Sequence, residues 1–203
     1  MKKQIPNLLT LLNLFCGIIA LRYALSQAFD WALFWFFLGI TLDFFDGFVA
    51  RILKVSSPLG KELDSLADLV TSGLVPGQVM YWLISYSAAH YGDALHFFLP
   101  FAGYLITLAS AYRLACFNLD TRQSDSFIGL PTPANALFII SLGVIVQQAV
   151  YLKAIPLWGT LLITGISCVL LNSNLRLLAL KFKDFSIKNN LLKYLLLLIS
   201  VVL

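Results

Sequence analysis

Residues 31–50 read WALFWFFLGITLDFFDGFVA, a run of twenty residues whose two charged side chains are Asp43 and Asp46. A helix that spans a membrane needs about 20 mostly apolar residues, so this run predicts a transmembrane helix with two carboxylates near its end. Similar runs predict further spans near residues 8–25, 65–87, 96–116, 134–151 and 155–172. The apolar run at 191–203 is shorter, so we expect a truncated helix or one that lies shallow in the membrane.

The composition excludes a soluble domain. Hydrophobic residues make up 60% of the 203 residues and charged residues 12%, whereas soluble domains average about 45–50% and 25%. We therefore expect an all-α, polytopic transmembrane helix bundle of about six to eight spans, forming one domain over residues 1–203. The three cysteines lack zinc or disulfide spacing. The net charge of +4 comes from scattered residues, which disfavours nucleic acid as a partner.

The basic residues predict how the chain is oriented. All Lys and Arg residues except Arg22 and Lys153 fall on one side of the predicted spans, and such residues accumulate in cytoplasmic loops. We therefore expect a cytoplasmic N-terminus and an integral, multi-pass protein, in the cytoplasmic membrane of a prokaryote. Residues 175–185 fit either an interfacial amphipathic segment or an ordinary basic linker.

Four of the ten acidic residues lie in or beside the second and third predicted spans: Asp43, Asp46, Asp64 and Asp68. Spacings of three and four residues place each pair on one face of its helix. Carboxylates at membrane depth are costly and usually functional, and facing carboxylates repel one another unless a cation separates them. Mg²⁺ and Mn²⁺ prefer carboxylate oxygen, so we expect two such ions. The alternative is ion pairing with Arg51, Lys54 or Lys61.

The acidic face of the second span also carries small residues. Gly47 and Ala50 follow Asp43 at i+4 and i+7, which predicts a recess beside the carboxylates. Ser56, Ser57 and Pro58 mark a turn in a predicted loop over 52–63, which returns the chain to the same membrane face. Arg51 adds a cation there. The expected metal ions and Arg51 together predict a site for a diphosphate.

Residues 43–68 fit the pattern D-x2-D-G-x2-A-R-x8-G-x3-D-x3-D, with Asp43, Asp46, Gly47, Ala50, Arg51, Gly60, Asp64 and Asp68 at its fixed positions. This pattern resembles the signature of the CDP-alcohol phosphotransferases, membrane enzymes that transfer a phosphatidyl or related group from a CDP-linked donor to an alcohol. The resemblance implies that the four Asp hold two metal ions and that Asp68 activates the acceptor hydroxyl. It also implies a homodimer with a polar cavity open to the cytoplasm, and a donor pocket formed by Gly47, Ala50, Arg51, Gly60, Asn7 and Thr10.

Three further segments resemble the phosphatidylserine synthase branch of that family: PNLLTLLNLFCG at 6–17, RLACFN at 113–118 and FIGLPTP at 127–133. This resemblance implies L-serine as the acceptor of the phosphatidyl group of CDP-diacylglycerol, with phosphatidylserine and CMP as products. It implies serine contacts from Asn13, Arg113, Asn118, Gly129 and Pro131. Without the resemblance, the polar and small residues of the first span fit helix packing equally well; these are Asn7, Thr10, Asn13 and Gly17. Arg113 also fits a charge that only orients the chain in the membrane.

Two other functions stay open at this point. The acceptor could be another alcohol, such as glycerol phosphate, inositol phosphate or choline, with the same chemistry. A divalent-cation transporter would also place carboxylates inside the membrane, although an Arg beside those acids serves a diphosphate better than a cation.

Overall fold

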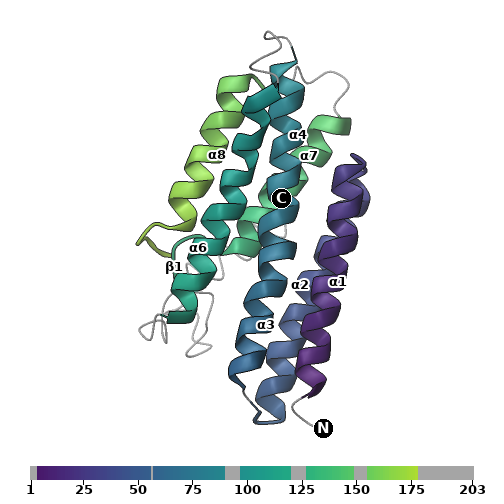
Figure 1. Ribbon diagram of the computed structural model, residues 1–203, viewed down its shortest axis with the longest axis vertical. Coiled ribbons are helices and arrows are strands. Elements are labelled where there is room, and N and C mark those ends of the chain that lie inside the picture. The colour runs from purple at the N-terminus through teal and green to yellow at the C-terminus, as the bar shows by residue number, and fades with distance from the viewer. Residues whose placement is uncertain (1–3, 56, 90–96, 120–126, 149–154, 178–203) are drawn as a thin grey trace, which may run out of the picture.

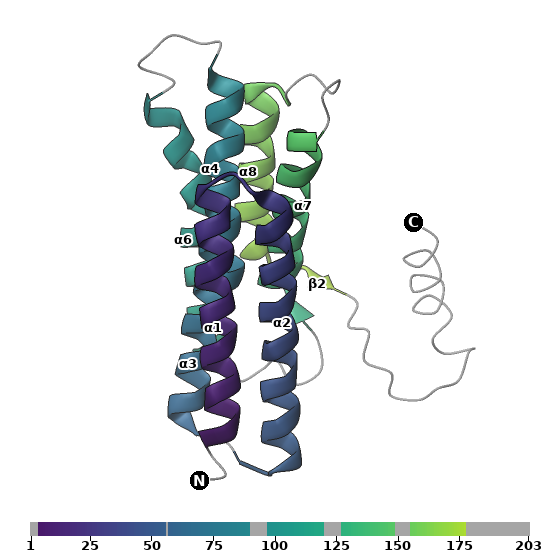
Figure 2. The same cartoon turned by 90° about the vertical axis from the view of Figure 1, so that its right-hand side faces the viewer.

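The computed structural model describes residues 4–55, 57–89, 97–119, 127–148 and 155–177. It is a bundle of long helices, as the sequence predicts (Figure 1). Helices α1 (Gln4–Leu25) and α2 (Phe29–Ile52) form an antiparallel pair that is joined by a short turn. They lie side by side along their length in both views (Figure 2).

The third predicted span forms one continuous helical rod in three parts: α3 (Pro58–Asp68), the π-helical segment η1 (Leu69–Leu74) and α4 (Val75–Ala88). The predicted loop over 52–63 is wrong in its extent, because α2 continues to Ile52 and α3 already begins at Pro58. Two local signals start the helix early. The Ser57 hydroxyl accepts a hydrogen bond from the Gly60 amide at 3.0 Å, and Pro58 occupies the first turn, where its missing N–H costs nothing.

The remaining described elements complete the bundle. The short 3-10 segment η2 (Leu99–Tyr104) leads into α6 (Leu105–Leu119), and α7 (Thr132–Gln148) and α8 (Leu157–Leu171) follow. Two strands of two residues each, β1 (Phe127–Ile128) and β2 (Arg176–Leu177), pair antiparallel beside them. This ladder is too small to change the all-α class.

Among the described residues, three helices are long and apolar enough to cross a membrane: Gln4–Leu25, Phe29–Ile52 and Leu99–Leu119. Helices α7 and α8 are apolar but shorter, and the rod at 58–88 starts with a polar segment that holds Asp64 and Asp68. The predicted run 191–203 lies outside the described residues, and so does most of the segment 175–185 that was predicted as interfacial or as a basic linker.

Apolar and polar packing occupy different parts of the bundle. A buried apolar cluster joins α4 to α2, α7 and α8 through residues such as Phe29, Phe36, Val79, Ile84 and Ile140. Many large side chains elsewhere are exposed, as expected for helices that face lipid, among them Leu8, Phe15, Trp31, Phe44 and Leu108. The N-terminal end of α1, the C-terminal end of α2 and the start of α3 extend together beyond the lower ends of α6, α7 and α8 (Figure 1). The acidic residues lie in that part of α2 and α3.

Candidate active site

Two neighbouring helices position the four carboxylates. Asp43 and Asp46 lie near the C-terminal end of α2, and Asp64 and Asp68 lie on α3. The turn at 53–57 folds α3 back, so that the end of one helix meets the start of the next. The short spacing between the two motif halves therefore brings both acidic faces to one place.

Three of the carboxylates form a compact group. Oxygen atoms of Asp43, Asp46 and Asp64 lie within 4.8 Å of one another, and Asp46 is buried while the other two are partly buried. Asp68 lies outside this group, yet it is close enough to interact electrostatically with Asp43 and Asp64. Such a set of hard oxygen donors fits a divalent cation. The donor chemistry and spacing therefore suit the metal that the sequence implies.

The nearby cations do not neutralise this group. The Arg51 guanidinium is exposed and its Nε donates to the Gly47 carbonyl oxygen at 3.1 Å. The Lys61 ammonium donates to the carbonyl oxygen of Asn118 on α6. Both side chains are thus engaged with main-chain oxygens, and neither forms an ion pair with the carboxylates in the part of the chain that the structure describes.

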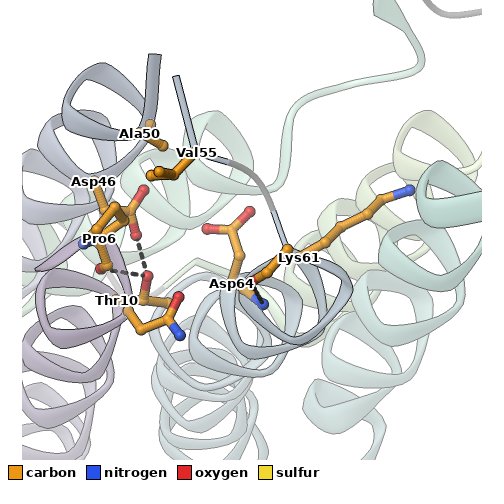
Figure 3. Close-up of a pocket in the computed structure, with 11 residues that line it drawn as sticks. Pro6, Thr10, Asp46, Ala50, Val55, Lys61 and Asp64 are labelled. Carbon is orange, nitrogen blue, oxygen red and sulfur yellow. Dashed lines mark hydrogen bonds between the residues drawn. The ribbon is translucent and has the colours of Figure 1, made fainter. Parts of the chain in front are cut away.

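Helix α1 contributes a polar side chain to the acids. The Thr10 hydroxyl contacts Asp46 Oδ2 and the Pro6 carbonyl oxygen, the latter at 3.1 Å (Figure 3). A hydroxyl has one proton to donate, and the Asp46 carboxylate is the acceptor that carries charge. Thr10 therefore fixes the orientation of one carboxylate within the group.

A cavity of about 350 Å³ opens beside the carboxylates. Helices α1, α2 and α3 and the turn between the last two line it, with Asp46 and Asp64 on opposite walls (Figure 3). A β-carbon added at Gly47 would have no atom within 4 Å, whereas one at Gly60 would lie 3.0 Å from Asn7 Oδ1. Gly47 thus leaves open space, and Gly60 allows α3 to approach α1.

The structure gathers most of the predicted donor-pocket residues at this cavity: Asn7, Thr10, Gly47, Ala50 and Gly60 all line it. Arg51 does not, since its side chain follows the α2 surface to Gly47. The cavity is also lined by four residues that were not predicted for the donor pocket: Pro6, Val55, Ser57 and Lys61. Pro6 adjoins the Asn7 motif and could have been included, but Val55 depends on the turn geometry, which the sequence does not define.

The predicted acceptor residues lie in three different places. Asn13 is fully buried on α1, and its Nδ2 lies 3.5 Å from Asp68 Oδ1. Asn118 donates to Ser65 Oγ at 2.8 Å, which links α6 to α3. Gly129 and Pro131 precede α7, where Gly129 has a φ of +78° and its amide donates to the Leu175 carbonyl at 2.9 Å. These last two residues therefore have a backbone role next to the end of α8.

Arg113 is buried on α6, and its Nε has no hydrogen-bond partner among the described residues. Ser110 lies three residues earlier on the same helix face and contacts Gly73 of η1: a β-carbon added there would lie 3.2 Å from the Ser110 β-carbon. The Arg113 face of α6 thus packs toward the segment that follows Asp68. A buried guanidinium with an unpaired N–H is costly, so this position favours an anionic ligand.

Comparisons with known proteins agree on one family. The family model described as CDP-alcohol phosphatidyltransferase matches residues 3–169. A CDP-diacylglycerol–serine O-phosphatidyltransferase of Bacillus subtilis is 37% identical over 142 residues, which cover 68% of this chain and 74% of the relative. Relatives of the same name from Helicobacter pylori and Saccharomyces cerevisiae are 37% and 32% identical. The matched segments span 55% and 58% of those two longer proteins.

Proposed function

The chain belongs to the CDP-alcohol phosphatidyltransferase family, and on that premise we propose that this membrane enzyme transfers the phosphatidyl group of CDP-diacylglycerol to the hydroxyl of L-serine. The observation that carries the proposal is the group of Asp43, Asp46 and Asp64 beside a cavity with an open wall at Gly47. The relatives are named CDP-diacylglycerol–serine O-phosphatidyltransferases, which supports serine as the acceptor.

We propose that the cavity receives the cytidine and diphosphate part of the donor. The lipid tails would extend between the exposed apolar faces of the helices. Divalent cations at the carboxylates, two Mg²⁺ or Mn²⁺ ions in this proposal, would neutralise charge on the diphosphate and on the departing CMP. Arg51 stays a proposed phosphate contact, because its guanidinium carries further N–H donors beyond the one used on Gly47.

In the proposed reaction, the serine oxygen attacks the phosphorus that carries the diacylglycerol. The bond from this phosphorus to the bridging diphosphate oxygen breaks, and CMP leaves. Asp68 takes the hydroxyl proton, which requires an ionised carboxylate within hydrogen-bond reach of the acceptor. Its place beside the three-acid group, yet outside it, supports this separate role.

We propose Arg113 as the partner of the serine carboxylate, since it is buried and its Nε has no partner among the described residues. Guanidinium groups bind carboxylates in a fork geometry. Asn118 and the Gly129–Pro131 segment would then shape the approach to this site. The family resemblance further leads us to propose a homodimer, several membrane spans and a site that faces the cytoplasm.

The test is to supply purified protein with CDP-diacylglycerol, Mn²⁺ or Mg²⁺ and a panel of labelled alcohols. We expect equal amounts of CMP and labelled phosphatidylserine with L-serine. Turnover with glycerol phosphate, inositol phosphate or choline in place of serine would assign another acceptor. Cation movement across a vesicle membrane without CMP release would favour the transporter instead.

A further inference from the structure

A buried hydrogen-bond chain connects η1 to Asp68 through α1. The Thr71 hydroxyl donates to Asn13 Oδ1 at 3.0 Å, and Asn13 Nδ2 lies 3.5 Å from Asp68 Oδ1. Thr71 and Asn13 are both fully buried. Thr71 lies three residues after Asp68 on the same rod, so both side chains can reach one Asn13 amide on the facing helix.

Two glycines hold the helices close around this chain. A β-carbon at Gly17 would overlap the Thr71 hydroxyl and lie 3.1 Å from the Thr71 Cα atom. A β-carbon at Gly39 would lie 3.0 Å from both Asn13 Oδ1 and the Thr71 γ-methyl. Helices α1 and α2 and the η1 segment therefore enclose the pair completely, and the asparagine amide finds its partners within the protein.

The direction of these hydrogen bonds matters for Asp68. An asparagine side chain has a carbonyl end that only accepts and an NH₂ end that only donates. When the Thr71 hydroxyl donates to the carbonyl end, the NH₂ end is left for Asp68. If the amide turned round, its carbonyl oxygen would face the Asp68 carboxylate, which is repulsive. Asp68 therefore selects this orientation of the amide, and the Thr71 hydroxyl holds it by donating to the carbonyl end.

We propose that Thr71 is a positioning residue for the transfer reaction: through Asn13 it holds the Asp68 carboxylate in the orientation in which it accepts the proton of the acceptor alcohol. This inference rests on the proposed function and gives Asn13 a role in orienting Asp68 rather than in binding serine. The π-helical form of η1, a feature frequent at functional sites, belongs to the same segment.

The test compares Thr71→Val with Thr71→Ser in the full-length protein, assayed for CMP release with Mn²⁺, CDP-diacylglycerol and the alcohol that the wild type uses best. Valine keeps the γ-methyl against Gly39 but removes the hydroxyl, and serine keeps the hydroxyl. We expect Thr71→Val to lower kcat roughly tenfold, as for loss of one buried hydrogen bond, with KM for the donor within about twofold. Thr71→Ser should recover most of the rate.

A double-mutant cycle with Asn13→Ala separates positioning from simple packing. Once the amide is gone, Thr71→Val should cost little further rate, since the proposed influence passes through that amide. Thr71→Ala, which removes the hydroxyl without added bulk, should repeat the loss if the valine variant fails to fold. A wild-type kcat in both hydroxyl-free variants, no recovery in Thr71→Ser, or additive losses in the cycle would each overturn the proposal.

The role of Thr71 can be measured whichever alcohol the enzyme uses as acceptor. Every variant is compared with the wild type on the same alcohol, so a different acceptor would refute serine and leave the role of Thr71 measurable. Conversely, wild-type turnover with serine together with an inert Thr71→Val would support the proposed function and refute the positioning role.

Discussion

Gly47 lines the cavity and leaves open space there, because a β-carbon at this position would meet no atom within 4 Å. We predict that Gly47→Leu fills this space and lowers binding of CDP-diacylglycerol at least tenfold, while Mn²⁺ still binds. Isothermal titration in detergent measures both affinities. Gly165→Leu on α8 is the matched control, since Gly165 also faces open space. Unchanged donor affinity in the Gly47 variant would place the pocket elsewhere.

Asp68 carries the proposed proton transfer. Asp68→Asn keeps the size of the side chain but cannot take up a proton, and loss of a general base typically costs about 10²- to 10⁴-fold in rate. The wild-type rate should rise with pH as the carboxylate ionises, and the asparagine variant should lose that rise. Rate measurements across pH at saturating donor check both points. An ordinary rate with an unchanged pH profile would require another proton acceptor.

Spacing alone places the acidic and small residues of α2 on one helix face and Asp64 and Asp68 on another, so these could be identified from sequence. Asn7, Thr10 and Gly60 were predicted only through the family resemblance. The roles of Arg51 and Lys61 could not be identified from spacing, since a long side chain reaches several partners. The structure directs them to the carbonyl oxygens of Gly47 and Asn118. The Thr71–Asn13 contact joins positions 58 residues apart and depends on how closely α1 meets η1, which no local pattern specifies.

Among the described elements, α4 and η2 pack backbone against backbone at Gly103. A β-carbon at Gly103 would lie 2.8 Å from the Met80 carbonyl carbon and from Tyr81 Cα, which are backbone atoms that cannot turn away. We predict that Gly103→Ala destabilises the fold by about 1–3 kcal/mol, the usual cost of overpacking. Thermal unfolding in detergent measures the change. Gly165→Ala on α8 should be nearly neutral, and equal stability of the two variants would contradict this packing.

The helix bounds show which parts of the fold can be predicted from sequence patterns alone. The apolar runs predicted six helical regions, and each corresponds to described helix. Helix α3 begins at Pro58, earlier than predicted, because Ser57 and Pro58 form an N-terminal cap. The same residues also fit a turn, which is how the sequence pattern was interpreted. The π-helical form of η1 has no comparable signature, because tertiary contacts decide between an α and a π turn.

For the whole molecule, the bundle separates an apolar core from a polar end that holds the first turns of α1 and the acids. We predict that this end faces the cytoplasm. In a cysteine-free background, Lys54→Cys should react with an impermeant maleimide in inverted vesicles, and Ser26→Cys, exposed at the opposite end of α1, in intact cells. The reverse labelling pattern would contradict the orientation that the basic residues predict.

The central claim is that the carboxylates of α2 and α3 support phosphatidyl transfer. Its most direct measurement is CMP release from CDP-diacylglycerol with L-serine and Mn²⁺ by the wild type and by Asp43→Asn, Asp64→Asn and Asp30→Asn. Asp30 serves as control because it binds Gln148 at the other end of α2. We predict turnover in the wild type and in Asp30→Asn, and loss of at least a thousandfold in the Asp43 and Asp64 variants with their helices still inserted. Near-normal CMP release by either of these two variants would contradict the account.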